Sequence, residues 1–336
     1  MYKKIYIVLI ILVLAIESYA QQGIILSQPY LNAQFLSPAS VGNGIYEHRL
    51  QTNLKAQFLD GKNLYRTLVS GWDTRFKNED PYQQNYFGIG AQIISDQAME
   101  GVINSNYVTI NVAYHLFLDD NLKKELSLGL GGTYGQTYLD KSQLRFGEGF
   151  NIDGTYTTSN YDYLNSINPY PHNFYYNTGL LYTKHEEKSF LQGGLSVSFL
   201  SRPKVLVLIV DTASGMKSSA FFNYEKELEN GNTFMTHLSY SNKNGLNQIV
   251  VGGLWGFPFN DKTEKINRIY VGCFDRLNDA IIPSISIMMD KYMLGLSYDI
   301  FNNDLSAAKI KQNSFELAFT VSFGNRRGEK MKTIFD

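Results

Sequence analysis

The sequence is poor in cysteine, tryptophan and charge. Its 336 residues include 1 Cys and 2 Trp, and 18% of them are charged. The lone Cys273 excludes an internal disulfide and a cluster of cysteine ligands. The charged fraction lies below the roughly 25% that is typical of a soluble domain. A net charge of -1 gives no electrostatic reason to expect a nucleic-acid partner.

Long apolar runs are absent after the first segment of the chain. Residues 1–20 combine Lys3 and Lys4, an apolar stretch over 5–16 and the small-residue sequence Ser18-Tyr19-Ala20. This order predicts a signal peptide over 1–20 rather than a membrane helix, which needs about 20 apolar residues. The longest later apolar run, 205–210, is too short to cross a bilayer as a helix. We therefore expect a periplasmic, secreted or barrel-inserted protein.

Aromatic residues are abundant, with 24 Tyr and 21 Phe among the 14% of the chain that is aromatic. Membrane β-barrels place aromatic girdles at both interfaces, so this composition favours a barrel. The last strand-like segment shows the matching pattern, because side chains alternate between the two faces of a strand. Its apolar and its polar or small side chains fall on opposite faces: Phe315, Leu317, Phe319, Val321 and Phe323 against Glu316, Ala318, Thr320 and Ser322.

Fourteen segments of this kind, each of about 10 to 16 residues, suit tilted strands that cross a bilayer. We assign their apolar faces to lipid and their polar or small faces to the lumen, which predicts an all-β transmembrane antiparallel β-barrel of 14 strands. Segment 203–212 is also β-prone, but an even strand number favours an excursion outside the barrel over a further strand. The predicted strands lie near 46–60, 64–77, 86–97, 104–118, 124–139, 172–184, 188–201, 217–228, 232–242, 246–258, 264–275, 279–289, 291–301 and 312–323.

The connections between these segments differ in length. With both termini in the periplasm, the long connections 140–171, 202–216 and 302–311 face outward, whereas most of those on the periplasmic side are tight turns. This asymmetry is typical of outer-membrane barrels. The connection 78–85 is the exception. The final strand is expected to pair with the first, which leaves no open edge in lipid.

Four parts of the chain follow from this reading. After the signal peptide, residues 21–45 do not fit the strand pattern, because Pro29, Pro38 and Gly42 interrupt regular pairing. The segment is still apolar, so we expect it to tuck into or under the barrel as a periplasmic or plug segment. The barrel itself is expected over 46–323, followed by a periplasmic tail over 324–336.

No catalytic, cofactor or metal site stands out in the sequence. The five His residues include no i, i+4 pair, and neither an HExxH motif nor a Gly-x-Ser-x-Gly elbow occurs. His115 is expected at a solvated position in the lumen. Residues 129–135 resemble a phosphate loop but lack its Gly-Lys-Ser/Thr ending, and glycines in a barrel strand also permit the close approach of another backbone. We therefore expect a non-enzymatic protein without a cofactor or a small-molecule substrate.

Charged residues inside the predicted strands are a further signal. Asp73, Arg75, Asp299 and Glu316 lie in barrel segments, where a charge that faces lipid costs roughly 2–4 kcal/mol at the midplane. We expect them to pair in the lumen, as structural groups or as parts of a gate. The tyrosine-rich stretch 156–176 fits a binding loop and an interface girdle equally well.

Several short motifs lie in a defined order along the chain. They run from Gln28-Pro29-Tyr30-Leu31-Asn32, Ser37, Pro38, Ala39 and Gly42, through Tyr65, Arg66, Asp73 and 111–116, to Arg276, Asp279, Asp299 and Glu316. In this order they resemble the PorP/SprF outer-membrane proteins of the Bacteroidetes type IX secretion system. The similarity covers nearly all of the mature chain, although Ser37 stands where the family usually has Asn.

The resemblance implies a fourteen-stranded barrel in the cell outer membrane that works with the type IX machinery and a secreted cargo protein. Family members support the export or surface attachment of particular cargo, and some are associated with gliding adhesins. The alternative is an outer-membrane channel or transporter for small or hydrophobic solutes, because a barrel of this size has room for a lumen. A barrel enzyme is disfavoured, since the sequence contains no credible catalytic grouping.

Overall fold

The computed structural model describes residues 24–59, 62–76, 84–140, 153, 172–200, 204–207, 210–213, 215–243, 245–259, 267–302 and 312–326. The expected signal peptide over 1–20 lies outside the described residues, as do residues 156–171 of the tyrosine-rich stretch and the tail from residue 327.

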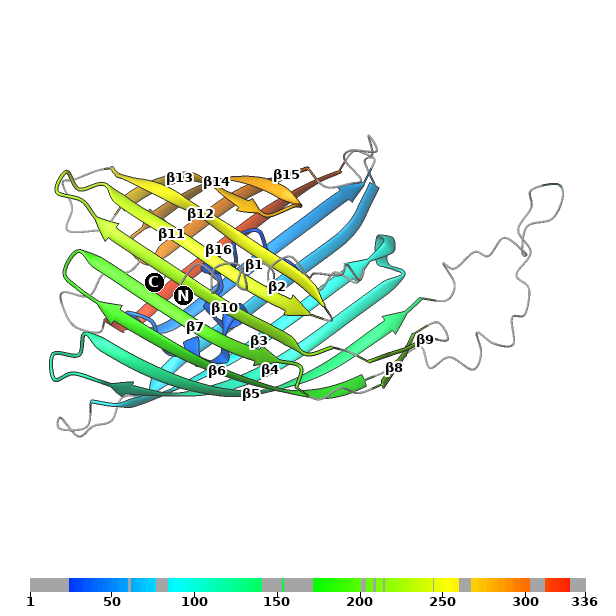
Figure 1. The fold of residues 1–336 in the computed structure, drawn as a ribbon, viewed down its shortest axis with the longest axis horizontal. Coiled ribbons are helices and arrows are strands. Elements are labelled where there is room, and N and C mark those ends of the chain that lie inside the picture. The colour runs from blue at the N-terminus through cyan, green and yellow to red at the C-terminus, as the bar shows by residue number, and fades with distance from the viewer. Residues whose placement is uncertain are drawn as a thin grey trace, which may run out of the picture.

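Antiparallel strands close into a barrel of 14, as predicted (Figure 1). Their bounds agree closely with the segments of alternating polarity in the sequence. The barrel strands are β1 (Tyr46–Leu59), β2 (Lys62–Phe76), β3 (Tyr86–Ala98), β4 (Ile103–Phe117), β5 (Lys124–Leu139), β6 (His172–His185), β7 (Ser189–Ser198), β10 (Lys217–Glu227), β11 (Thr233–Lys243), β12 (Leu246–Pro258), β13 (Asn267–Arg276), β14 (Ala280–Met289), β15 (Tyr292–Phe301) and β16 (Gln312–Arg326).

The barrel closes between its first and last strands. In the register of β1, Leu54 lies opposite Leu317 of β16 on one side and opposite Leu68 of β2 on the other. This confirms the predicted pairing of the final strand. β16 runs past the expected end at 323, because its last residue, Arg326, still pairs with Tyr46 across an irregularity in the register of β1.

The described residues of segment 203–212 lie outside the barrel, as predicted. Its residues form β8 (Lys204–Val207) and β9 (Val210–Ala213), a separate two-stranded sheet. Figure 1 places this sheet at the end of the barrel where β5 ends and β6 begins. We call this end the outer end and the opposite one, where β1 begins, the inner end.

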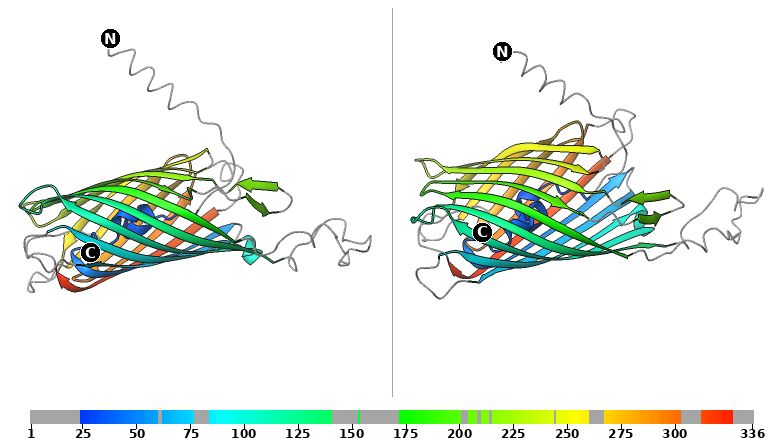
Figure 2. Two further views of the ribbon diagram at one scale, coloured as in Figure 1. Left: turned by 90° about the horizontal axis from the view of Figure 1, so that it is seen from below. Right: turned by 60° about the horizontal axis from the view of Figure 1, so that its bottom comes forward.

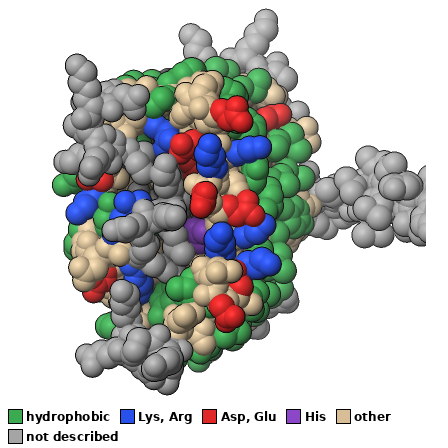
Figure 3. All heavy atoms as spheres, turned by 90° about the vertical axis from the view of Figure 1, so that its left-hand side faces the viewer, with side chains coloured by type: hydrophobic (Ala, Val, Ile, Leu, Met, Phe, Trp, Pro, Cys, Tyr) green, Lys and Arg blue, Asp and Glu red, His purple; other side chains and the backbone are tan. Residues whose placement is uncertain are grey.

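The two faces of the barrel wall differ in chemistry as the alternation predicts. On β5, Leu128 and Leu130 are 54% and 61% exposed on the outside, whereas Glu125 and Ser127 are fully buried in the lumen. An apolar outer band is what a bilayer requires. At the inner end, Lys, Arg, Asp and Glu side chains surround the mouth of the barrel. Hydrophobic side chains cover the outer wall beside it (Figure 3).

The chain before β1 lies inside the barrel (Figures 1 and 2). We call residues 24–45 the luminal segment. It contains three short helices, η1 (Pro29–Leu31), α2 (Ala33–Leu36) and η2 (Pro38–Ser40), and all of its residues from 26 onward except Phe35 are buried. None of the helices in the described residues is long and apolar enough to cross a membrane.

Candidate functional site in the barrel lumen

Local sequence explains why the luminal segment folds into short turns rather than a strand. Pro29 and Pro38 each begin a helix, where the missing N–H of proline leaves no hydrogen bond unmade. The Asn32 side chain accepts a hydrogen bond from the Phe35 N–H at 3.3 Å, and the Ser37 hydroxyl accepts one from the Ala39 N–H at 3.2 Å. These caps satisfy backbone donors that have no helical partner. The result is a compact chain that fits inside the barrel.

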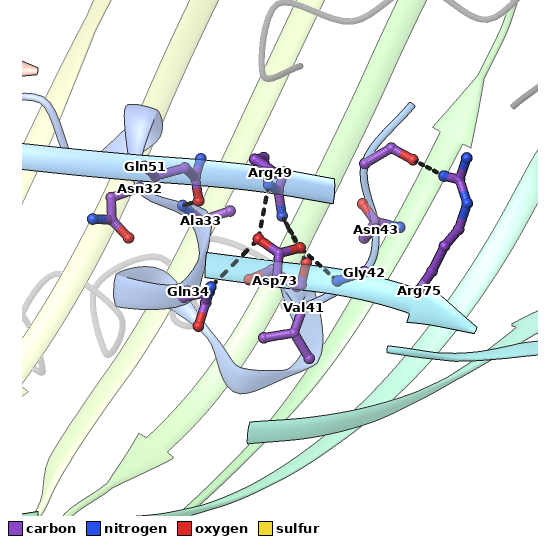
Figure 4. Close-up of polar contacts among 12 residues, drawn as sticks. Asn32, Ala33, Gln34, Val41, Gly42, Asn43, Arg49, Gln51, Asp73 and Arg75 are labelled. Carbon is purple, nitrogen blue, oxygen red and sulfur yellow. Dashed lines mark hydrogen bonds and ion pairs between the residues drawn. The ribbon is translucent and has the colours of Figure 1, made fainter. Parts of the chain in front are cut away.

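Asp73 of β2 is the first anchor of this segment (Figure 4). Its carboxylate accepts hydrogen bonds from the Gly42 N–H at 2.7 Å and from the Gln34 side chain at 3.3 Å. The Arg49 guanidinium of β1 donates to both oxygens of the same carboxylate, each at 3.1 Å. Arg49 also reaches the Ser40 carbonyl oxygen at 3.0 Å. A bidentate ion pair on the wall therefore holds two separate points of the segment.

The C-terminal part of the luminal segment, next to β1, is held by close backbone packing. Gly42 has φ +77°, a conformation that favours glycine, and a Cβ added to it would lie 2.7 Å from the Cα of Gly88 in β3. Arg75 of β2 donates to the carbonyl oxygens of Gly44 and Ile45 at 2.5 and 2.9 Å. Glycine is therefore required where the chain turns from the lumen into β1.

Glu316 of β16 is the second anchor. Its carboxylate accepts hydrogen bonds from the backbone N–H groups of Ser27 at 2.5 Å and Gln28 at 3.0 Å. The Asn53 side chain of β1 donates to the same carboxylate at 2.9 Å. The carboxylate thus satisfies backbone donors near the start of the segment that would otherwise be buried without partners.

Asp299 of β15 lies beside this anchor, at the centre of a buried charge network. It accepts hydrogen bonds from the Ser27 hydroxyl at 2.6 Å and from the Lys55 ammonium and the Arg276 guanidinium at 2.9 Å each. Arg276 also pairs with Asp279 at 2.5 Å. Two cations and two carboxylates therefore balance one another across β1, β13 and β15, which is the condition under which buried charges are tolerated.

Glu125 of β5 forms the third anchor, near the inner end. It accepts hydrogen bonds from the Asn43 side chain at 2.5 Å and from the Tyr86 hydroxyl at 3.0 Å, and lies 2.9 Å from Nδ1 of His115. Nε2 of His115 lies 2.8 Å from the Val41 carbonyl oxygen and donates to it, because a carbonyl only accepts. His115 faces the lumen as predicted, but the expectation of a solvated position is wrong. Its side chain is fully buried, because the luminal segment covers it.

Glycines of β5 and β6 form the surface on which the middle of the segment rests. A Cβ added to Gly129 would lie 2.5 Å from the Cα of Ala39, and one added to Gly179 would lie 3.0 Å from the Cδ of Pro38. Real Cβ atoms essentially never make a contact as close as the first, and the second is tighter than nine in ten real Cβ contacts. Gly129 thus serves the close approach of another backbone rather than a phosphate loop, in agreement with the sequence interpretation.

The opposite wall of the lumen contacts the segment through apolar side chains. Tyr30 stacks on Phe274 of β13 with ring centroids 5.0 Å apart, and also contacts His237 of β11 at 5.7 Å. Tyr30 and Leu31 belong to one cluster with buried side chains of β11 to β16. Burial raises the pKa of the Tyr30 phenol, so the hydroxyl stays neutral.

The structure brings most of the sequence-predicted site residues together. Within the luminal segment these are Ser37, Pro38, Ala39 and Gly42, and on the wall around it they are Asp73, Arg276, Asp279, Asp299 and Glu316. Tyr65 lines a cleft of about 180 Å³ toward the outer end, next to Arg276 and Asp279. Arg66 is not part of the site, because its exposed side chain lies on the face of β2 opposite to the luminal Thr67.

Sequence reasoning missed several residues of the site: Asn43, Arg49, Asn53, Lys55 and Glu125. A signal for the strand residues among them was available, since each occupies a position that alternation assigns to the lumen. In the part of the chain that the structure describes, no group of three or more His, Cys, Asp or Glu side chains is placed to hold a metal ion. The contacts that the structure does show anchor a peptide segment by carboxylates and close packing.

A closed antiparallel barrel with an apolar outer face and a polar lumen defines this protein as an outer-membrane β-barrel protein. The chain belongs to the PorP/SprF family, whose model, described as "Type IX secretion system membrane protein PorP/SprF", matches residues 18–321. A search of curated proteins found no match.

Two solved structures are similar to this chain at low sequence identity. The CymD monoaromatic hydrocarbon channel is similar with a TM-score of 0.50 and 11% identity, over 90% of this chain and 94% of that one. The Ralstonia pickettii toluene transporter TbuX has a TM-score of 0.49 and 7% identity, over 92% of this chain and 97% of that one. At such identity the likeness to CymD shows the fold alone.

Proposed function

We propose that this protein is a non-enzymatic component or accessory of the type IX secretion system in the outer membrane. It supports the export or surface attachment of specific cargo proteins of the gliding-adhesin kind. Its N-terminal residues 1–20 direct its own export, and its turns at the inner end and its tail meet the periplasmic parts of the machinery. Family membership supports the secretion role, since the model of the family covers most of the chain.

The single observation that carries the docking role is the anchoring of the luminal segment. Asp73, Glu316 and Glu125 each bind backbone or side-chain donors of this segment, and they do so from three different strands. A hydrogen bond to a charged group contributes about 1.5–3 kcal/mol, so the several that reach the segment from these carboxylates together hold it against thermal motion. A barrel filled in this way is suited to a docking platform or a regulated gate rather than to a free pore.

Deletion of the gene tests the proposal. We expect cargo that depends on this protein to disappear from the cell surface, as measured by surface labelling and immunoblotting of outer-membrane fractions. Re-expression of the intact chain restores the surface cargo. Normal surface cargo after deletion of this protein and its paralogues would overturn the secretion role.

A solute channel is the second candidate, supported by the cleft of about 180 Å³ that Lys55, Tyr65 and Arg276 help to line. Single-channel conductance and liposome swelling separate the two functions. The docking function predicts closed barrels with no steady conductance, whereas a channel conducts or admits solutes in the absence of secretion partners.

A further inference from the structure

A patch of hydrogen-bond donors lines the lumen toward the outer end, apart from the anchors of the luminal segment. Lys217 of β10 and Lys243 of β11 are direct partners in the strand register, and Ser198 of β7 is the partner of Lys217 on its other side. Ser219 and Ser241 are likewise partners in the register, two residues further along the same strands. We call these five side chains the donor patch.

Alternation shows that the donor patch faces the lumen. Lys217 and Ser219 share a face of β10 with the buried Asn223, and Ser241 and Lys243 share a face of β11 with the buried His237. All five residues of the patch are half-buried, so they are not sealed from solvent. The patch is therefore part of the luminal wall toward the outer end and keeps partial contact with solvent.

Within the part of the chain that the structure describes, no hydrogen bond or ion pair involves any of the five side chains of the donor patch, and none of the five is a carboxylate. Asp96 of β3 attracts Lys243 electrostatically, but it forms no ion pair with it and instead accepts a hydrogen bond from the Thr67 hydroxyl at 2.5 Å. The positive charge of the patch is thus only partly compensated.

Two like charges directly opposite one another on neighbouring strands are destabilising, so Lys217 and Lys243 need a compensating interaction. Aromatic rings offset part of their repulsion. The Lys217 ammonium lies 4.4 Å from the centroid of the Phe35 ring, and the Lys243 ammonium lies 5.1 Å from that of Phe199. These cation–π contacts hold both ammonium groups in place while leaving their N–H groups free to donate. Since Phe35 belongs to the luminal segment, the patch also borders that segment.

We propose that the donor patch binds a phosphate-type oxyanion. Two ammonium groups match its charge, and three serine hydroxyls add donors that suit the several oxygens of a tetrahedral anion better than the two of a carboxylate. Inorganic phosphate and the phosphate ester of a lipid headgroup share this chemistry. The site is independent of the secretion role, because it rests on the register and the unpartnered donors alone.

Calorimetric titration of the purified full-length protein in detergent, with inorganic phosphate and separately with glycerol 3-phosphate, tests the proposal. We expect saturable binding that weakens about tenfold or more in Lys217→Gln and in Lys243→Gln, since each removes a charge-assisted hydrogen bond. Lys217→Arg retains binding, because the charge and the donors remain. The matched control is Lys226→Gln, on the exposed face near the inner end of the same strand. This control leaves binding unchanged.

The outcomes separate the ligand sources and decide the proposal. Tighter binding of glycerol 3-phosphate assigns the site to a headgroup ester, and equal binding of both ligands assigns it to free phosphate. The proposal is wrong if neither ligand binds saturably to the intact protein, or if Lys226→Gln weakens binding as much as the luminal variants do. Circular dichroism of each variant verifies that the barrel is folded. Ser241→Ala, which keeps both positive charges, weakens binding less than the lysine variants do.

Discussion

The two walls that face the luminal segment hold it by different physics. The charged wall, formed by Arg49, Asp73, Asp299 and Glu316 of β1, β2, β15 and β16, binds it through directed hydrogen bonds and ion pairs. The apolar wall, centred on Tyr270 and Phe274 of β13, packs against Tyr30 and Leu31. Burial of apolar surface is not directional, whereas a buried carboxylate accepts only from donors in the right place. The charged wall therefore determines the path of the segment, and the apolar wall stabilises it by burying apolar surface.

The largest effect is expected at the charged wall. Asp73→Asn leaves the Arg49 guanidinium buried without its counter-charge, although the volume of the side chain hardly changes. We expect the free energy of unfolding to fall by about 3–5 kcal/mol in guanidinium titrations of the protein in lipid vesicles. Asp120→Asn, on the exposed turn between β4 and β5, is the control and leaves stability unchanged. Equal stability of the two variants would mean that Asp73 does not anchor the segment.

At the apolar wall, shape is expected to matter more than polarity. Tyr30→Ala removes the ring that stacks on Phe274 and leaves a cavity, which costs about 3 kcal/mol. Tyr30→Phe costs less than about 1 kcal/mol, because the hydroxyl contact with Gln28 is long, at 3.5 Å. The same unfolding measurement checks both variants. A large loss in Tyr30→Phe would show that the apolar wall also depends on polar contacts and would break the comparison.

A smaller effect is expected where the segment rests on glycine. Gly129→Ala forces its Cβ against Ala39, and we expect overpacking to cost about 1–3 kcal/mol. Limited proteolysis in vesicles reports whether residues around Ala39 become accessible. Gly193→Ala in β7 is the matched control, since its nearest neighbour would lie at an ordinary 3.7 Å. If proteolysis detects no difference between the two variants, the contact with Gly129 does not hold the segment.

The smallest effect is expected outside the lumen, at the inner end. The hydrogen bond from Lys184 holds the pKa of the exposed Glu186 carboxyl below its usual value of 4.5. A lowered pKa in the folded state adds stability only above the ordinary carboxyl range, and this is lost as the pH falls. Because the pair is exposed, we expect Glu186→Gln to shift the thermal midpoint barely at pH 7 and not at pH 3. A loss of stability as large as that of Asp73→Asn would contradict the expectation that buried luminal ion pairs contribute more than exposed pairs at the inner end.

Much of the fold was predictable, because its main signal is local. Alternation over 124–139 and 312–323 places Leu128 and Phe315 toward lipid and Glu125 and Glu316 toward the lumen without knowledge of any partner strand. The even strand number then separated 203–212 from the barrel. The end of β16 was placed too early because its last residues pair with Tyr46, a contact that only barrel closure creates.

The candidate site was only partly predictable, because its contacts join residues that are far apart in the chain. The family pattern pointed to Asp73 and Glu316, but nothing local in the sequence pairs Glu316 with Ser27, which lies 289 residues away. His115 was assigned to solvent because a polar residue on a luminal face normally meets water. The luminal segment occupies that space instead.

The sequence by itself determined the class of fold, the strands and the face of the wall that each side chain occupies. These follow from a period of two and from the chemistry of lipid on one side of the wall. Only the tertiary structure decided which carboxylates receive the luminal segment and that two lysines meet on neighbouring strands. Those contacts depend on closure and register, which join residues far apart in the chain and leave no local trace in it.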